Sequence, residues 1–109
     1  MKFTVETETT YVPDVYDNKE LPEDEQVSVV IKTPTASETS SIAKGGEIST
    51  PDILAGVARF VKRVKNLEVN GKEITNGREL VAAEGMYVLA LNVGAHILGM
   101  MTEVDKDPT

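Results

Sequence analysis

Apolar and polar residues alternate in two stretches near the start of the chain. Residues 3–9 place Phe3 and Val5 on one side and glutamates on the other. Residues 26–33 read QVSVVIKT, which puts three β-branched residues on one side before Pro34. A period of two with β-branched residues is typical of half-buried strands. We therefore predict two strands that pair antiparallel across the segment between them.

Polar segments flank the second of these strands. Residues 11–26 are rich in proline, aspartate and asparagine, which predicts a long loop, and such loops are often functional or mobile. Small polar residues fill positions 35–44. They are compatible with irregular structure or with a short helix that is capped by Thr35 or Ser37 and ends at Gly45.

A helical period begins after Ser49. The run Ser-Thr-Pro-Asp offers a hydroxyl N-cap, a proline in the first turn and an acid near the positive end of a helix. Apolar residues then recur every three or four positions. This pattern predicts a helix over residues 51–65 with one apolar stripe. Its basic face would carry the cations near its end, Arg59, Lys62, Arg63 and Lys65.

The rest of the chain predicts a hairpin and two helices. Asn70-Gly71 between short alternating stretches is a strong hairpin signal, because both turn positions need a positive φ. Asn76, with Glu79 three residues later, is suited to cap a short helix. Apolar residues then dominate positions 86–104, which predicts the last helix.

These elements indicate an α+β fold. We expect a small antiparallel sheet from the N-terminal half, a C-terminal helical half and a short β-hairpin. The length suits one domain over residues 1–109. Within it, residues 1–50 would form a strand-rich half with a long acidic loop. Residues 51–104 would supply a helix, the hairpin and further helices, and residues 105–109 a polar tail.

The last predicted helix is apolar on nearly every side. A helix of this kind must be buried on more than one side. Two readings stay open: the whole helix is core, or part of it contacts another subunit or an apolar partner helix. One of its faces is therefore a candidate surface for partner binding or self-association, with residues Tyr87, Leu91, Gly94, Leu98 and Met101.

The composition and charge of the chain argue against several classes of function. The net charge is -7, and acids are concentrated in the first 26 residues, which argues against nucleic acid as a partner. The chain has no cysteine, so disulfides and thiolate metal sites are excluded. Its N-terminus lacks a signal-peptide pattern, and its longest apolar stretch is too short to span a membrane. We expect a cytoplasmic protein without a membrane partner.

No set of residues predicts catalysis. His96 is the only histidine, and a lone histidine in an apolar helix is more often partly buried than a general base or metal ligand. The loop acids lack the spacing of a calcium loop, and Ser40, Ser41 and Ser49 lie outside any nucleophile elbow. A basic DNA-recognition helix through Arg59 is disfavoured by the overall charge. We expect a binding protein, not an enzyme, without cofactor, metal or catalytic residues.

Two stretches carry a family resemblance. The sequence FVKRVKNLEVNGKEITNGRE, at positions 60–79, resembles the C-terminal half of tail assembly chaperones of long-tailed bacteriophages and prophages. The sequence NKELPEDEQV, at positions 18–27, is similar to their N-terminal half. The resemblance spans roughly residues 11–105. It implies a chaperone in the bacterial cytoplasm that binds the tape-measure protein and forms homo-oligomers.

Two other functions remain as alternatives. A structural virion or tail subunit would use the sheet edge and the long loop for subunit contacts. A small enzyme would combine His96 with the loop acids. The absence of any clustered catalytic pattern disfavours the second alternative.

Overall fold

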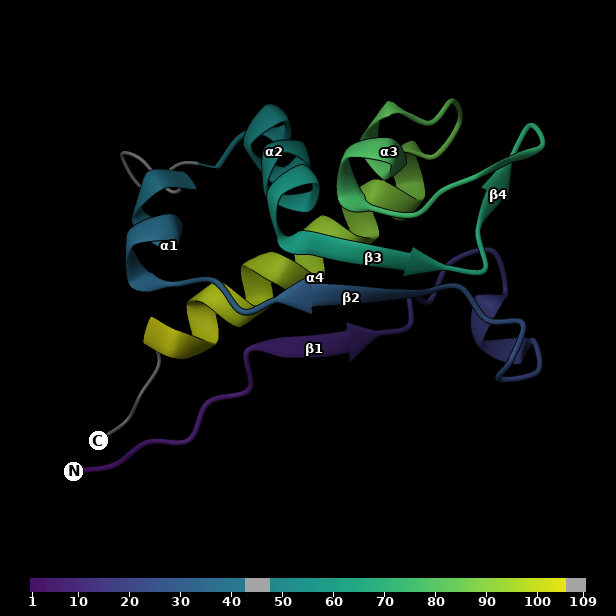
Figure 1. The fold of residues 1–109 in the computed structure, drawn as a ribbon. Helices are drawn as coiled ribbons and strands as arrows, with labels where there is room; N and C mark the ends of the chain where they lie inside the picture. The colour runs from purple at the N-terminus through teal and green to yellow at the C-terminus, as the bar shows by residue number, and fades with distance from the viewer. Residues whose placement is uncertain (43–47, 106–109) are drawn as a thin grey trace.

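The computed structural model describes residues 1–42 and 48–105, and it has the α+β fold that the sequence predicts. An antiparallel three-stranded sheet has the order β1–β2–β3 (Figure 1). A long helix, α4, crosses one face of this sheet, and α2 and α3 lie side by side near β3. The strands of the sheet are β1 (Glu8–Tyr11), β2 (Ser28–Lys32) and β3 (Val61–Lys65).

β1 and β2 pair antiparallel as predicted, but β1 begins later than expected. Thr9 pairs with Ile31, whereas residues 3–6 belong to no strand and Phe3 is 79% exposed. Backbone hydrogen bonding explains why β1 begins no earlier. The amide of Thr33 donates to the carbonyl oxygen of Thr7 at 2.9 Å, and Pro34, which has no amide hydrogen, cannot continue the ladder.

The predicted helix over residues 51–65 is wrong in its second part. α2 (Thr50–Phe60) ends at Phe60, and the chain continues directly into β3. Val61 and Val64 pair with Ile31 and Val29 of the central strand, with a bulge between Val30 and Ile31. β-branched residues favour a strand once a neighbouring strand supplies hydrogen bonds and side-chain contacts. The third strand of the sheet therefore comes from the C-terminal half of the chain.

Local capping signals place the first two helices. α1 (Ala36–Ile42) follows Thr35, whose hydroxyl accepts a hydrogen bond from the Glu38 amide at 3.1 Å. α2 begins with a reciprocal capping box between Ser49 and Asp52. The predicted end of the first helix at Gly45-Gly46 lies outside the described residues.

The hairpin forms at the predicted turn. β4 (Glu68–Val69) and β5 (Lys72–Glu73) pair antiparallel around Asn70 and Gly71, whose φ angles are 53° and 79°. Positive φ at both positions is what a type I′ turn requires. Asn76 caps α3 (Gly77–Ala82) by accepting from the Glu79 amide at 2.9 Å, as predicted.

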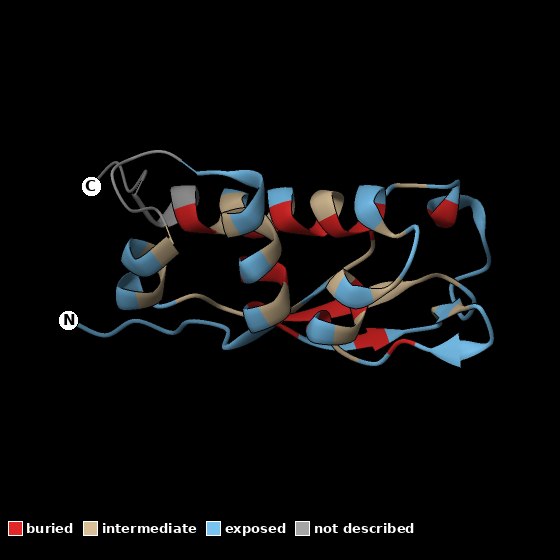
Figure 2. Cartoon of the chain, turned by 90° about the horizontal axis from the view of Figure 1, so that it is seen from above, coloured by how far each residue is buried: buried red, intermediate tan, exposed pale blue. Residues whose placement is uncertain are grey.

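α4 (Tyr87–Asp105) closes the core between the sheet and α2. Figure 2 shows its buried residues turned toward the sheet and its exposed residues turned away. Leu89, Val93, Ile97 and Met101 recur every four positions and are almost fully buried. Among the described residues, no helix is long and apolar enough to cross a membrane. The core thus uses one side of α4, and the opposite side faces solvent.

Gly94 explains how α4 approaches α2 so closely. A Cβ atom at this position would lie 2.2 Å from the Cγ2 atom of Ile53 and 3.3 Å from that of Val57. Glycine therefore permits the contact that an alanine would obstruct. This contact brings Val57 and Phe60 of α2, both 0% exposed, into one core with α4.

Candidate functional site

An apolar pocket lies where the long loop meets the start of α4, and we call it the loop-end pocket. Two exposed residues of the loop form its rim, Tyr16 at 64% and Leu21 at 44% exposure. Its cavity volume is about 220 Å³. The other apolar side chains that line it also pack against the core: Val15, Val27, Leu67, Met86 and Leu89.

Asn18 holds the loop in the shape that forms this pocket. Among the described residues it is the only buried polar side chain, at 5% exposure. Its Nδ2 donates to the carbonyl oxygens of Pro13 and Val27, each at 2.9 Å, and its Oδ1 accepts from the Val27 amide at 2.8 Å. A buried amide with its hydrogen bonds made fixes the segments that it joins. Asn18 therefore ties both ends of the loop together.

The backbone at the rim adopts an unusual conformation. Tyr16 and Asp17 have φ angles of 52° and 57°, which lie in the left-handed region. Aspartate enters this region readily, but a bulky residue such as tyrosine does so at a cost. Residues held in such conformations cluster at binding and active sites. The strained residue here is also an exposed aromatic side chain at the mouth of an apolar pocket.

The size of the pocket indicates what it can hold. Small-molecule and cofactor sites usually have volumes of at least about 300 Å³. A cavity of about 150 Å³ already accommodates a benzene ring. The volume of about 220 Å³ lies between these values and matches one large apolar side chain of a partner. Anchors of this kind dominate many protein interfaces.

The first turn of α4 adds apolar surface beside the pocket residues Met86 and Leu89. Tyr87 is 57% exposed and Val88 is 53% exposed. Exposed apolar residues scattered singly are ordinary, but several beside one apolar pocket form a candidate interaction surface. This end of the molecule can therefore bury additional apolar surface of a partner.

The five residues that the sequence predicts as one binding face of the last helix differ in their exposure in the structure. Gly94 and Met101 are buried in the core of the chain, while Leu91 and Leu98 are half-buried. Tyr87 is the exposed member of the set, near the loop-end pocket. A role for this face in partner binding or self-association stays a prediction, and its accessible part is the first turn.

His96 lies in a packing contact between β1 and α4. Its ring stacks on Tyr11 with 3.9 Å between centroids and 6° between planes. The Tyr11 hydroxyl donates to Oδ1 of Asn92 at 2.7 Å. Burial raises the pKa of Tyr11, and the nearby Asp14 carboxylate adds to this rise, while the hydrogen bond to Asn92 opposes it. The two rings join the sheet to the last helix.

The other candidate residues lie apart from one another. Ser49 caps α2, whereas Ser40 and Ser41 lie on α1. Within residues 1–42 and 48–105, no three acidic or histidine side chains gather closely enough to hold a metal ion. The four predicted basic residues split between elements. Arg59 lies in the last turn of α2, and β3 contains the other three, Lys62, Arg63 and Lys65.

The sequence patterns do not predict the loop-end pocket. They indicate a long polar loop, but they do not connect its apolar residues Val15, Tyr16 and Leu21 with the distant Leu67 and Met86. Asn18 lies between Asp17 and Lys19 and matches the composition of a turn, so no local signal distinguishes it from its neighbours. Comparison of the chain with protein-family models, curated proteins and solved structures gave no match.

Proposed function

We propose that this chain is a non-enzymatic binding protein, and specifically a tail assembly chaperone that binds the tape-measure protein of a long-tailed bacteriophage or prophage. The observation that carries the proposal is the loop-end pocket with its exposed, strained Tyr16. In this role the chain works in the bacterial cytoplasm and keeps apolar helices of its partner from aggregating.

An apolar helix is the partner element that suits the site. A helix that docks into a groove presents apolar anchors every three or four residues. One anchor enters the loop-end pocket, and its neighbours along the helix contact the exposed Tyr87 and Val88. Full burial of one large aliphatic or aromatic side chain contributes about 1.5–3 kcal/mol. A few such contacts give an association that can be reversed when the tail tube replaces the chaperone.

Both stretches that resemble the chaperone family contribute residues to the loop-end pocket. The stretch at positions 18–27 contributes Asn18, Leu21 and Val27 to the pocket. The stretch at positions 60–79 contributes Leu67. Both resembling stretches therefore meet at one apolar pocket, although they are far apart along the chain.

Co-expression with a segment of tape-measure protein tests the proposal. We expect the wild-type chain to keep the segment in the soluble fraction and to co-elute with it. The double variant Tyr16→Ser, Leu21→Ser removes the apolar rim without touching the core. It should reduce the soluble segment by about tenfold, because two partly buried apolar contacts are lost.

A matched control replaces two exposed apolar residues elsewhere, Phe3→Ser and Ile48→Ser, and should behave as wild type. The proposal fails if the segment stays insoluble with the wild-type chain, or if both double variants lose binding equally. Recovery of the chain in purified tails would instead assign it as a structural subunit, because a chaperone leaves before the tail is finished.

A further inference from the structure

Acidic residues border the apolar cavity of the loop-end pocket. Three residues of the loop that line the pocket each have an acid as a direct neighbour in the sequence. These acids are all exposed, and we call them the acidic rim: Asp14, Asp17 and Glu20. Lys19 is the one base between them. A further acid, Glu68, follows the pocket residue Leu67. The opening of an apolar cavity thus carries a net negative charge.

No ion pair in the described part of the chain neutralises the acidic rim. Neither its three carboxylates nor Lys19 form an ion pair within residues 1–42 and 48–105. The Asp17 side chain makes no capping hydrogen bond to the short helical turn Asn18–Glu20 that follows it. The hydrogen bonds that hold the loop come from the Asn18 side chain instead. The rim carboxylates therefore stay available to a partner.

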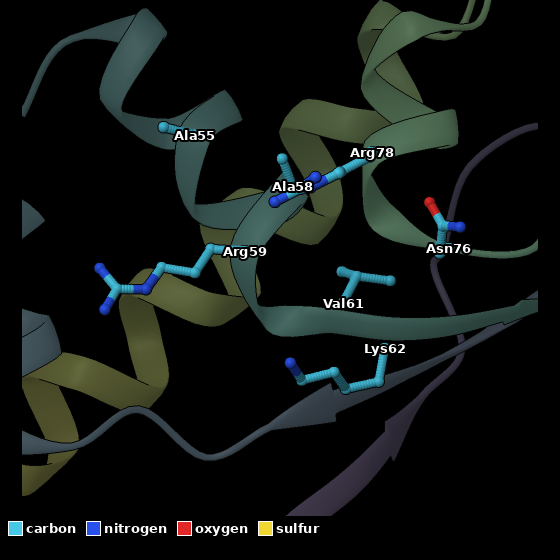
Figure 3. Close-up of a pocket in the computed structure, with 7 residues that line it drawn as sticks. All are labelled: Ala55, Ala58, Arg59, Val61, Lys62, Asn76 and Arg78. Atoms are coloured by element: carbon cyan, nitrogen blue, oxygen red, sulfur yellow. The ribbon is translucent and has the colours of Figure 1, made fainter.

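Basic side chains gather in another part of the fold. Figure 3 shows Arg59, Lys62 and Arg78 around a groove between α2, β3 and α3, where they extend in different directions. They do not converge on one site, and none of them lines the loop-end pocket. The chain's own bases thus leave the acidic rim to cations from outside.

The exposed ring of Tyr16 favours a cation at the same place. Tyr16 is 64% exposed and lies directly before Asp17 of the acidic rim. The face of a tyrosine ring attracts the charged group of lysine or arginine. The methylene groups of these side chains can also cover apolar surface while the charged end stays in water. One cation beside an apolar anchor therefore suits both the ring and the neighbouring carboxylate.

We propose that the loop-end pocket selects an apolar anchor that is flanked by lysine or arginine on the same face of a partner helix. Residues three or four positions apart share a helix face, so these cations lie one turn from the anchor. They contact the acidic rim while the anchor fills the cavity of about 220 Å³. The inference rests on the proposed binding of an apolar helix at this pocket, and it adds the charge that the helix carries.

Other occupants fit the bordered pocket less well. An uncharged helix would cover the rim carboxylates and take water from them without supplying a partner, which costs free energy. A helix with acids beside its anchor would bring like charges together. A metal ion has no support, because no three acidic or histidine side chains of the described residues gather closely enough to hold one.

Three designed helical peptides of equal length test the inference. All carry the same apolar stripe with a central leucine as the anchor. The first has two lysines one turn before this leucine on the same face, and the second has glutamates at those positions. The third has the two lysines two positions from the leucine, on the opposite face. Fluorescence anisotropy of the labelled peptides measures Kd at about 0.1 M and about 1 M salt.

The position of the lysines should decide the affinity. The same-face lysine peptide should bind the wild-type chain at least about tenfold more tightly than the glutamate peptide at about 0.1 M salt. It should bind about threefold or more tightly than the opposite-face peptide, although the two have the same net charge. Both differences should shrink to within about twofold at about 1 M salt, where the screening length is about 3 Å.

A rim variant and a matched control locate the effect on the protein. Asp17→Asn, Glu20→Gln should lower the preference for lysine over glutamate by about threefold or more. Asparagine tolerates the left-handed conformation at position 17, where φ is 57°, so the loop keeps its shape. The control Glu6→Gln, Glu8→Gln also raises the net charge by two, from -7 to -5, but it lies at the start of β1, whereas the loop follows the end of β1.

The control should keep the wild-type preference, because it loses only the exposed ion pair between Glu8 and Arg63 at 3.7 Å. Circular dichroism spectra and melting temperatures check that each variant folds. Equal binding of the two lysine peptides, or an equal loss in the control, would show that only the overall charge attracts cations and would overturn the inference.

The same measurements distinguish this inference from the proposed function. If the lysine and glutamate peptides bind equally and Tyr16→Ser, Leu21→Ser weakens both, the apolar site stands and the selection of cations is wrong. If the wild-type chain binds none of the peptides, or if Tyr16→Ser, Leu21→Ser leaves their binding unchanged, the loop-end pocket is not the site. The proposed site then fails together with this inference.

Discussion

Asn18 and Tyr16 lie two residues apart in the loop and have opposite energetic roles. Asn18 stabilises the loop, because its amide satisfies the backbone groups of Pro13 and Val27 in a buried position. Tyr16 adopts a left-handed backbone conformation that tyrosine disfavours. The hydrogen bonds of Asn18 thus offset the strain that keeps an aromatic side chain at the mouth of the loop-end pocket.

Replacing Tyr16 by glycine separates stability from binding. Glycine adopts φ near 52° without the cost that a Cβ atom imposes, so Tyr16→Gly should raise the free energy of unfolding by about 1 kcal/mol. The same change removes the exposed ring and should weaken binding of an apolar helix. Urea denaturation and co-elution with the partner segment measure the two effects. A variant that is both less stable and fully competent to bind would contradict this reading of Tyr16.

The carboxylate of Glu38 makes hydrogen bonds at the start of α1 whose contribution to stability depends on pH. Nζ of Lys32 donates to its carboxylate at 2.6 Å, and the Thr35 amide donates at 3.0 Å. The hydrogen bond from Lys32, followed by that from the Thr35 amide, lowers the pKa of Glu38 from 4.5 to about 2. A carboxyl group whose pKa is lower in the folded state stabilises the fold above the unfolded value and loses that effect as the pH falls.

The variant Glu38→Gln should therefore melt at a lower temperature than wild type at neutral pH. The difference should shrink as the pH falls from about 4.5 to about 2, because the wild-type carboxylate becomes protonated over that range. Thermal melts at several pH values, with the carboxyl shift of Glu38 followed by NMR, measure this. A difference in melting temperature that is independent of pH would show that the charge of Glu38 does not stabilise α1.

At the scale of elements, the junction between α2 and β3 shows that a helical period in the sequence does not by itself determine where a helix ends. The spacing of Val57, Phe60, Val61 and Val64 fits a helix, yet the chain becomes extended at Val61, with φ -78° and ψ 110°. Pairing with the central strand decides the outcome, because it satisfies backbone groups that a longer helix would leave beside an unpaired sheet edge. The apolar period of this one segment carries no information about the central strand β2 with which it pairs.

α3 shows the same dependence on its neighbours. A Cβ atom on Gly77 would lie 2.2 Å from the carbonyl oxygen of Val57 and 2.9 Å from the Cβ atom of Val61. The start of α3 therefore packs directly on the place where α2 passes into β3. This contact brings Arg78 next to Ala55 and Ala58 of α2.

The hairpin contains two like charges that face each other across its strands. Glu68 lies directly opposite Glu73 across the two strands. Like charges in facing positions destabilise a sheet, and opposite charges contribute roughly 0.2–1 kcal/mol. The variant Glu73→Lys should therefore slow hydrogen exchange of the Ile74 amide, which donates to the Leu67 carbonyl oxygen, by about twofold or more.

The matched control Glu6→Lys makes the same change in net charge at an exposed position outside the hairpin. It should leave exchange of the Ile74 amide unchanged. Equal slowing in both variants would show that the overall charge, and not the facing pair of glutamates, limits the stability of the hairpin.

At the scale of the whole molecule, the loop-end pocket lies where the long loop meets the start of α4. It combines side chains from the loop, from the segment before β4 and from the beginning of α4. The apolar surface that a partner could contact there depends on the assembled fold and not on α4 alone.

The sequence by itself determined those features that depend on residues within a few positions of one another. The Asn70-Gly71 turn, the Ser49–Asp52 capping box and the Asn76 cap all form as predicted. Each is a short-range arrangement in which local hydrogen bonds or φ preferences select one conformation. The α+β class and the antiparallel pairing of the first two strands follow from periodicity in the same direct way.

Only the tertiary structure decided where α2 ends, which side of α4 is buried, and how the loop-end pocket forms. The pocket joins Leu21 to Leu67 through packing between separate elements. Such contacts depend on which hydrogen bonds and apolar faces distant segments offer to one another. That information lies in the assembled core and not in any single stretch of the chain.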